Sequence, residues 1–391
     1  MKILIVTVDP AFPAISGADL RSWQNVQAAS DLGDVLLVSI VPPGPEIPSP
    51  GIATAHLAGV DTSVIWTSDF DIVFSAESID RFQLLAARFQ PDVIILESLI
   101  FANLVGVAKN CARCVVIDLH NVESDLVGQE TATWKQRIFR VMDARVRRIR
   151  AIEQKAIQQA DVAWVCSSID RDRLAKDGAD EKRIAVIPNG IPRPDSIRDE
   201  QRRKGAAWPV LLFIGHLGYP PNIDAALSLI ELMPLLWRHH PESRLILAGR
   251  TPDPVIGRKA RPGKIFLVPN PTSVQPLLLN ADFAVIPLQR GGGTRIKVLE
   301  AMAWGLPVVA TARAVEGLDL IDGQDVRLAE TAEEFVTAIR ELCADSTKYE
   351  SQVLAARRHV MAYFGPEAVR TLIHTGLRSL VETKLPSNRT R

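Results

Sequence analysis

The chain has 391 residues, more than one hydrophobic core usually serves, so we expect two domains. Hydrophobic residues make up 47% and charged residues 23%, as in ordinary globular proteins, and the formal net charge of zero argues against a general nucleic-acid binder. No apolar run approaches the roughly 20 residues of a membrane span, and the first apolar segment is too short for a signal peptide, so a cytoplasmic protein is expected.

In the first half of the chain, apolar runs of strand length alternate with helical stretches. Helical patterns such as 78–89 and 134–159 fall between several of the runs. This alternation is typical of a doubly wound α/β domain with a parallel sheet, which we predict over residues 1–192. The predicted strands are 2–8, 35–40, 92–97, 114–119, 161–166 and 184–187.

Two strand ends in this domain carry candidate ligand-binding residues. Ser16 with Asp19 three residues on resembles a capping box, so a helix should begin near Gly17. A glycine there could let a diphosphate approach backbone N–H groups, with Arg21 one turn further in, although an ordinary turn glycine would look the same. His120 directly follows a predicted strand, at the edge where open α/β sheets bind ligands, which favours a functional role.

The stretch 134–160 is strongly basic for a predicted helix, with eight basic and two acidic side chains. Apolar residues at near-helical spacing indicate that another face is core. The basic face is either simply solvated, or it is attracted to anionic lipid headgroups or a phosphorylated acceptor, at about 1 kcal/mol per basic residue near a membrane surface. Peripheral contact with the inner membrane face is the second of these expectations.

Residues 193–205 are polar and lack apolar periodicity, and are predicted to be a linker. A second alternating set follows and predicts another doubly wound domain over residues 206–364. The last helix, about 365–385, comes after this second sheet is complete and could pack back on the first domain. The predicted strands are 210–214, 244–248, 265–268, 283–287 and 308–311, with helices near 222–237 and 273–279.

The strongest functional motif lies between the strand 283–287 and the next predicted helix. Three consecutive glycines, Gly291, Gly292 and Gly293, let the backbone approach a ligand and turn its N–H groups outward. Thr294 is a suitable N-cap for the helix, which should end near a later Gly-Leu-Pro sequence. Strand, turn, helix and the following strand form a βαβ unit.

Arg295 and Lys297 add two positive charges to the first turn of this helix. Cations there oppose the helix dipole at about 0.3–1 kcal/mol each, so stability alone disfavours them. A bound phosphate reverses the sign, since charge-assisted hydrogen bonds contribute roughly 1.5–3 kcal/mol each. The turn is therefore predicted to bind an anion. Glu300, an acid among apolar residues, either pairs with Lys297 three residues back or accepts hydrogen bonds from sugar hydroxyls.

These features together resemble a GT-B glycosyltransferase and, more narrowly, glycosyltransferase family 4. The resemblance covers nearly the whole chain in the family's order, and its most specific part is the last segment. The matching segments are Ser16-Gly17-Ala18-Asp19-Leu20-Arg21, Asp118-Leu119-His120-Asn121, Ile187-Pro188-Asn189-Gly190, Phe213-Ile214-Gly215 with Pro221-Asn222-Ile223-Asp224, and Gly291 to Thr311.

The resemblance implies two Rossmann-like domains facing a cleft and the transfer of a sugar from a nucleotide-sugar donor to an acceptor. It also implies retention of the anomeric configuration, and neither a metal nor another cofactor. The acceptor would be a glycan, a lipid-linked molecule or a small molecule. Two other classes stay open, namely a nucleotide-sugar sensor without catalysis and a non-hydrolysing nucleotide-sugar epimerase, which needs no acceptor.

The resemblance also implies roles for individual residues. Glu300 matches the family's second glutamate, which holds the ribose hydroxyls, whereas the first of the pair falls at Gly292 and its carboxylate is absent. Many members place an Arg and a Lys for the diphosphate where this chain has His216 and Asn222. The expected phosphate ligands are therefore Arg295 with Lys297 and the N–H groups of Gly17 and of 292–294. His216 and Asn222 are still expected in the donor site, and His120 would face the donor sugar.

Overall fold

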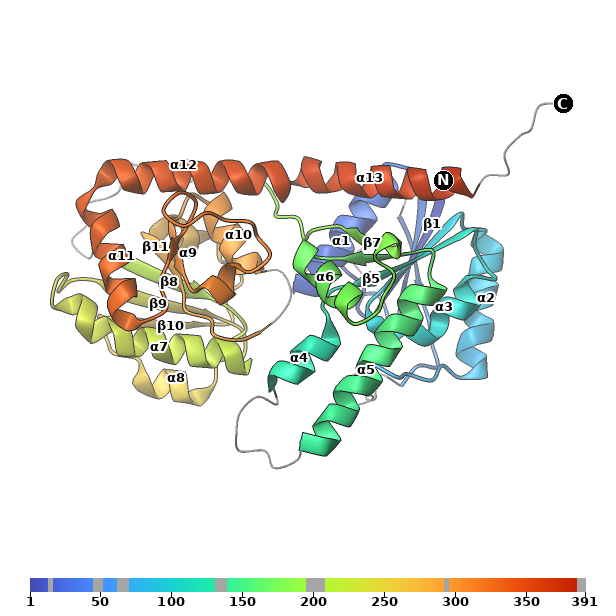
Figure 1. Cartoon of the computed structure of the whole chain (residues 1–391), viewed down its shortest axis with the longest axis horizontal. Coiled ribbons are helices and arrows are strands. Elements are labelled where there is room, and N and C mark those ends of the chain that lie inside the picture. Colours follow the sequence, from blue (N-terminus) through green and yellow to red (C-terminus); the bar gives the residue numbers. More distant parts are fainter. Residues whose placement is uncertain are drawn as a thin grey trace. The chain divides into compact units, whose positions relative to one another are not determined.

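The computed structural model describes residues 1–12, 17–44, 52–61, 70–130, 139–194, 208–291 and 295–384. Within these ranges the chain divides into two compact units (Figure 1). The first unit holds the described residues of Met1–Gly190 and those from Glu367 onward, and the second holds Ile191–Gly291 and Arg295–Pro366. The predicted linker at 193–205 lies outside the described residues beyond Pro194.

The first unit is built on a seven-stranded parallel sheet in the order β3-β2-β1-β4-β5-β6-β7. Its strand order reverses direction between β1 and β4, which is the mark of a doubly wound sheet. The predicted fold class is thus confirmed for this half. The strands are β1 (Lys2–Thr7), β2 (Asp34–Ser39), β3 (Ile52–His56), β4 (Val93–Glu97), β5 (Cys114–Leu119), β6 (Val162–Val165) and β7 (Ile184–Val186).

Helices cover both faces of this sheet because alternate strand residues point to opposite sides. Side chains such as Ile3 and Ile5 pack with α1 and α13, whereas Leu4 and Val6 pack with α2, α3 and α5. Both faces are therefore apolar, as expected for a buried parallel sheet. The helices of this unit are α1 (Gly17–Ser30), α2 (Ala76–Phe89), α3 (Val105–Ala108), α4 (Glu123–Glu130), α5 (Phe139–Gln159), α6 (Ser168–Lys176) and α13 (Pro366–Thr383), with 3-10 turns at Leu99–Leu104 and Glu181–Arg183.

The last helix, α13, packs on the first unit although it follows the second unit in sequence. Its apolar stripe of Val369, Ile373 and Leu377 is fully buried in the core on the α1 side of the sheet. His374 bonds through Nε2 to the Ala28 carbonyl at 2.8 Å, and Arg370 lies 3.2 Å from the Asp31 carboxylate. The C-terminal helix is thus an integral layer of the first unit.

The second unit has a six-stranded parallel sheet in the order β10-β9-β8-β11-β12-β13, again doubly wound. The two-domain α/β prediction is confirmed. The strands are β8 (Val210–Ile214), β9 (Arg244–Gly249), β10 (Ile265–Pro269), β11 (Phe283–Ile286), β12 (Val308–Ala310) and β13 (Arg327–Leu328), and the helices are α7 (Pro220–Trp237), α8 (Pro254–Lys259), α9 (Gln275–Asn280), α10 (Ile296–Ala303), α11 (Ala332–Ala344) and α12 (Ser346–Tyr363), with a 3-10 turn at Ala312–Val315.

The helix after the glycine turn, α10, begins one residue later than the sequence suggested. Its N-cap is Arg295, whose side chain makes no capping hydrogen bond, so the expectation that Thr294 caps this helix is wrong. Thr294, Gly292 and Gly293 lie outside the described residues. The helix ends as predicted, with Gly305 just beyond it at φ +83°, a backbone conformation that favours glycine.

Candidate functional site

The predicted site residues that the structure describes fall into one group in each unit, at the carboxyl ends of the parallel strands. In the second unit, Lys297 on the first turn of α10 reaches the end of β8. Its Nζ lies 2.5 Å from Asn222 Oδ1 and 4.7 Å from the centroid of the Phe213 ring. Asn222 in turn donates from Nδ2 to the carbonyl of His216 at 2.9 Å. Three of the predicted donor-site residues therefore meet at one point of the fold.

Lys297 carries a charge that its surroundings do not balance. Burial, and then the positive charge of Arg295, lower the pKa of Lys297 to about 7. Within the described ranges no carboxylate lies within ion-pair distance of Lys297. The side chain of Arg295 is also buried, at 7% exposure, and donates from Nη2 to the Gly291 carbonyl at 2.7 Å. Two cations thus lie close together at a helix N-terminus.

Gly291 sets the geometry of the turn that leads into α10. Its φ of +116° is strained for any residue with a side chain, so the turn requires glycine at this position. Its carbonyl accepts from Arg295 and from Arg313 Nη2 at 2.9 Å, which fixes the direction of the peptide. The neighbouring Arg290 points elsewhere, to an exposed ion pair with Asp224 at 2.6 Å.

Glu300 lies one turn further along α10 and is mostly buried. Burial raises the pKa of its carboxyl to about 7. Among the described residues it forms no ion pair with Lys297, so the first of its two sequence interpretations is not found. A mostly buried carboxyl of this kind keeps its ability to accept hydrogen bonds from a ligand that replaces the water around it.

His216 lies at the same edge of the sheet and is exposed. Its Nε2 lies 2.9 Å from Thr251 Oγ1, at the end of β9. Thr251 and Asn270 both have left-handed backbone conformations, with φ of +44° and +48°, and the Thr251 N–H donates to Asn270 Oδ1 at 2.9 Å. Strained non-glycine residues gather at functional sites, and sequence reasoning missed both of these.

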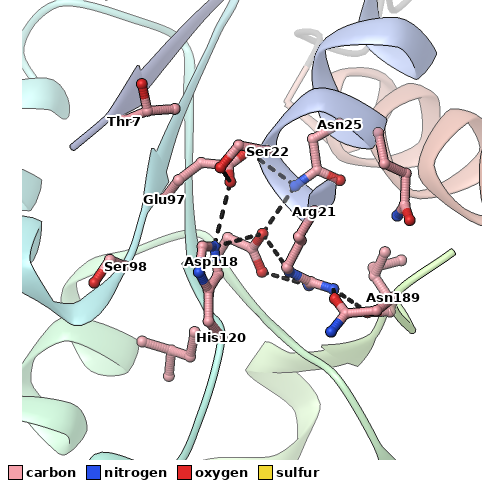
Figure 2. A network of polar contacts seen from close by, with 12 residues as sticks. Thr7, Arg21, Ser22, Asn25, Glu97, Ser98, Asp118, His120 and Asn189 are labelled. Carbon is pink, nitrogen blue, oxygen red and sulfur yellow. Dashed lines mark hydrogen bonds and ion pairs between the residues drawn. The ribbon is translucent and has the colours of Figure 1, made fainter. Parts of the chain in front are cut away.

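In the first unit, Arg21 has a different role from the one its position suggested. It is 1% exposed and forms a two-fold ion pair with Asp118, with contacts of 2.5 and 2.8 Å (Figure 2). Its other nitrogen donates to the Ile187 carbonyl and to Asn189 Oδ1, both at 2.8 Å. Arg21 is therefore part of a buried network, and these contacts do not support the one of the two sequence interpretations that placed it beside Gly17 in an anion site.

His120 lies where the sequence placed it, just beyond β5. Its Nε2 is 3.3 Å from Glu97 Oε2, at the end of the neighbouring strand β4 (Figure 2). Both side chains line a pocket of about 240 Å³ within this unit. Ala18 of α1 lines the same pocket, so the exposed Gly17 at the helix N-terminus is next to a lining residue. The pocket is otherwise rich in acids, which are Asp9, Asp19 and Glu123.

Glu97, Asp118 and His120 could each offer one ligand atom to a metal ion, since these atoms lie within 4.8 Å of one another. Both oxygens of Asp118 already accept hydrogen bonds from Arg21. Ser98, directly after Glu97, has φ +122°, a conformation that costs roughly 1–3 kcal/mol for a residue with a side chain. We predicted neither this strain nor a role for Glu97 from the sequence.

Arginines of the basic helix α5 form ion pairs within the first unit. Arg148 lies 2.6 Å from Asp71, and Arg150 lies 2.8 Å from Asp177. Arg147 and Lys155 are exposed. No helix in the described ranges combines the length and the apolar character needed to cross a membrane.

Two family models match the chain, one in each unit. The model described as a glycosyl transferase 4-like domain matches residues 22–190, and the model described as glycosyl transferases group 1 matches residues 208–345. Between them they contain most of the residues discussed above, including His120, Asn222 and Lys297. No curated protein matches the chain in sequence.

Solved structures share the whole fold at low sequence identity. Sucrose-phosphate synthase from Thermosynechococcus elongatus has a TM-score of 0.77 at 17% identity, covering 98% of this chain and 99% of its own. Anabaena HepE in complex with UDP and glucose has a TM-score of 0.70 at 15% identity, covering 97% and 100%. WaaG, involved in lipopolysaccharide biosynthesis, has a TM-score of 0.66 at 15% identity, covering 95% and 99%. With both domain models matched in order, this chain belongs to the group 1, family 4-like glycosyltransferases of the GT-B fold.

Proposed function

We propose that this enzyme transfers a sugar from a nucleotide-sugar donor to an acceptor, and that Arg295 and Lys297 neutralise the diphosphate of the donor. The observation that carries the proposal is the mostly buried Lys297, which has a second cation beside it and a neutral amide, Asn222, as its hydrogen-bond partner. Burying two neighbouring cations without an anion lowers the stability of the protein, and a bound anion with two negative charges offsets this loss.

The same groups can assist the chemical step. Departure of the nucleoside diphosphate builds negative charge on a phosphate oxygen, and cations already fixed in place stabilise that charge without reorganising. The proposal includes N–H groups of the glycine turn as further donors at this position. In this scheme the cations of the chain neutralise the leaving group, so we propose that no metal is needed. We also propose that the anomeric configuration is retained, which is what the resemblance to family 4 implies.

Other residues of the chain are proposed to contact the rest of the nucleotide-sugar. We assign the ribose hydroxyls to Glu300, the diphosphate also to the N–H of Gly17, and the donor sugar to His120. His216, beside Thr251 at the strand edge, would contact the nucleotide. Uridine is the first base to test because HepE has been solved in complex with UDP and with UDP-glucose. The acceptor is proposed to be a glycan or a lipid-linked molecule.

The test is a thermal-shift panel of nucleoside diphosphates and their sugars, followed by turnover assays. A ligand at 100 times its dissociation constant stabilises a protein by about 2.7 kcal/mol, which is measurable as a shift in melting temperature. We expect one nucleoside diphosphate and its sugars to stabilise the protein clearly more than the others. If no member of the panel shifts the melting temperature, the donor site proposed here is wrong.

Turnover separates the transferase from its two alternatives. A transferase releases nucleoside diphosphate in the presence of an acceptor, and glycan and lipid-linked acceptor pools are offered separately. An epimerase converts the donor alone to an isomer that NMR detects. A sensor binds the donor but gives neither product.

A further inference from the structure

Glu97 and Asp118 are neighbours at the edge of the first sheet where the ligand pocket opens. They are directly paired in the register of the parallel strands β4 and β5, and they are 1% and 0% exposed. Two carboxylates so close together in a buried place repel each other unless donors and cations surround them. Glu97 and Asp118 differ in which of these donors they accept hydrogen bonds from.

Of the two acids, Asp118 is the one that pairs with the buried cation Arg21. Its two oxygens accept from Arg21 at 2.5 and 2.8 Å, and Oδ2 also accepts from Asn25 Nδ2 at 2.8 Å. Glu97 receives neutral donors from the same helix, which are Ser22 Oγ at 2.7 Å and Asn25 Nδ2 at 2.9 Å (Figure 2). One face of α1 thus fixes both carboxylates, and within the described ranges Glu97 has its ion-pair-distance contact with the ring of His120, at 3.3 Å.

The contact between Glu97 and His120 determines which ring nitrogen is available to a ligand. A carboxylate only accepts hydrogen bonds, so His120 Nε2, at 3.3 Å, carries the proton in this contact. Asp118 Oδ2 is further from Nε2, at 3.8 Å, and is already engaged by Arg21 and Asn25. With Nε2 committed to Glu97, the nitrogen left for the pocket is Nδ1. The ring is 17% exposed and lines that pocket.

We propose that Glu97 is a positioning residue for His120, and that it fixes the Nε2–H tautomer and the ring orientation so that Nδ1 contacts the sugar substrate. The inference rests on the proposed function for the identity of that substrate. The assignment of the His120 tautomer does not depend on the proposed function. Ser22 and Asn25 hold Glu97 in place, as the second layer of contacts commonly does for a functional histidine.

The first test reads the tautomer directly. Nitrogen-15 NMR of histidine-labelled protein, with the His120 signal assigned by its loss in His120→Gln, is recorded up to pH 9 so that neutral imidazole is reached. We expect the Nε2–H form in the wild type. In Glu97→Gln, an NH2 group replaces one of the two oxygens that accept from Ser22, Asn25 and His120. Because His120 Nε2–H then loses its carboxylate acceptor, we expect the tautomer population to shift toward Nδ1–H.

The second test uses turnover with the donor and acceptor that the wild type accepts. We expect Glu97→Gln to lower kcat about 10-fold or more and to change the pH profile of kcat, with a smaller change in KM. The matched control is Glu153→Gln. Glu153 is also a buried acid of this unit, but it accepts from Ser124 at 2.7 Å instead of contacting His120. We expect the control to leave the His120 signal and the pH profile unchanged.

The outcomes are distinct. An Nδ1–H tautomer in the wild type, or a tautomer unaffected by Glu97→Gln, overturns the role of Glu97. The expected tautomer shift in a protein that shows no transfer supports the positioning role and contradicts the proposed function instead. If Glu97→Gln does not fold, Glu97→Asp withdraws the carboxylate from His120 Nε2 by one methylene and is expected to shift the tautomer population less, in the same direction; no shift there counts against the proposal.

Discussion

Lys297 and Asn222 form a 2.5 Å hydrogen bond between residues 75 positions apart in the sequence, on α10 and α7. The amide of Asn222 is oriented by its second bond, in which Nδ2 donates to the His216 carbonyl, so Oδ1 must face the lysine. An amide oxygen solvates an ammonium group but brings no negative charge. The pair therefore holds Lys297 in place while leaving its charge to be balanced by a ligand.

The first prediction is that donor binding takes up a proton. The pKa of Lys297 is lowered to about 7 by burial and by Arg295, and a bound diphosphate favours the charged form. Affinity for UDP should therefore fall as the pH rises from about 7.5 to 9, by up to about tenfold per pH unit. Isothermal titration calorimetry in two buffers of different ionisation enthalpy measures the number of protons taken up.

Lys297→Met is the control for this experiment. It should bind UDP weakly and lose the proton uptake, while the opposite contribution of Glu300, which is mostly ionised above about pH 7.5, stays small in this range. Equal affinities of the wild type at pH 7.5 and pH 9 would show that Lys297 does not bind the diphosphate.

The second prediction concerns the space around the Lys297–Asn222 pair. A Cβ atom at Gly215 would lie 3.0 Å from Asn222 Nδ2 and 3.1 Å from Lys297 Nζ, closer than such atoms normally approach. We expect Gly215→Ala to displace the pair and to weaken UDP binding by about 10-fold, roughly the loss of one charged hydrogen bond. Binding is measured by calorimetry at pH 7.5.

Gly257→Ala is the matched control. A Cβ atom there meets only Leu267 Cδ2 at 3.7 Å, an ordinary contact, and the residue lies within α8. UDP affinity should be unchanged, and the protein should be more stable by about 0.5–1 kcal/mol because alanine favours a helix over glycine. Unchanged UDP affinity in Gly215→Ala would instead mean that the pair tolerates displacement or does not contact the nucleotide.

The third prediction compares two arginines of one turn. Arg295 is buried and donates to the Gly291 carbonyl, whereas Arg290 is partly exposed and pairs with Asp224. We expect Arg295→Ala to lower transfer by at least about 100-fold, the size of comparable losses of fixed electrostatic stabilisation. Arg290→Ala should stay within about threefold, since exposed pairs contribute little. Wild-type turnover by Arg295→Ala would remove this residue from the mechanism.

The fold and the second-unit site were largely predictable because they depend on local patterns. Buried parallel strands appear as continuous apolar runs, and a glycine turn before a basic helix start predicts an anion site. The strand β3 (Ile52–His56) was missed because it lies at the sheet edge and only Ile52 is buried, so its sequence IATAH has little apolar character. The Lys297–Asn222 contact was not foreseen, although both residues were candidates.

The first-unit network could not be predicted residue by residue, because it depends on tertiary pairing. In the sequence, Arg21 is a cation near the start of a helix. Nothing in the neighbouring residues indicates that it forms a buried ion pair with Asp118, 97 residues later. One signal was available in retrospect. Glu97 and Asp118 are acids at the ends of two apolar runs that a parallel sheet places side by side, and such acids need partners.

The last prediction concerns the cost of the Glu300 carboxylate. Burial raises its pKa from 4.5 to about 7, so the folded protein binds this proton more tightly than the unfolded chain does. The resulting stability is present below about pH 4.5 and is lost as the pH rises through 7. Glu300→Gln, which removes the charge, should therefore match the wild type near pH 4 and exceed it by about 1 kcal/mol or more at pH 8, or a few degrees in melting temperature.

Melting curves of Glu300→Gln at the two pH values test this, with the exposed Glu333→Gln of α11 as a control expected to change stability by less than about 0.5 kcal/mol at either pH. If Glu300 also accepts the ribose hydroxyls, the stabilised variant must bind UDP more weakly at pH 8, since an amide is a poorer acceptor than a carboxylate. Higher stability with unchanged affinity would leave Glu300 as a buried acid without a ligand, and lower stability would mean that its charge is balanced within the protein. Stability gained together with affinity lost is the result expected of a residue retained for binding at a cost to the fold.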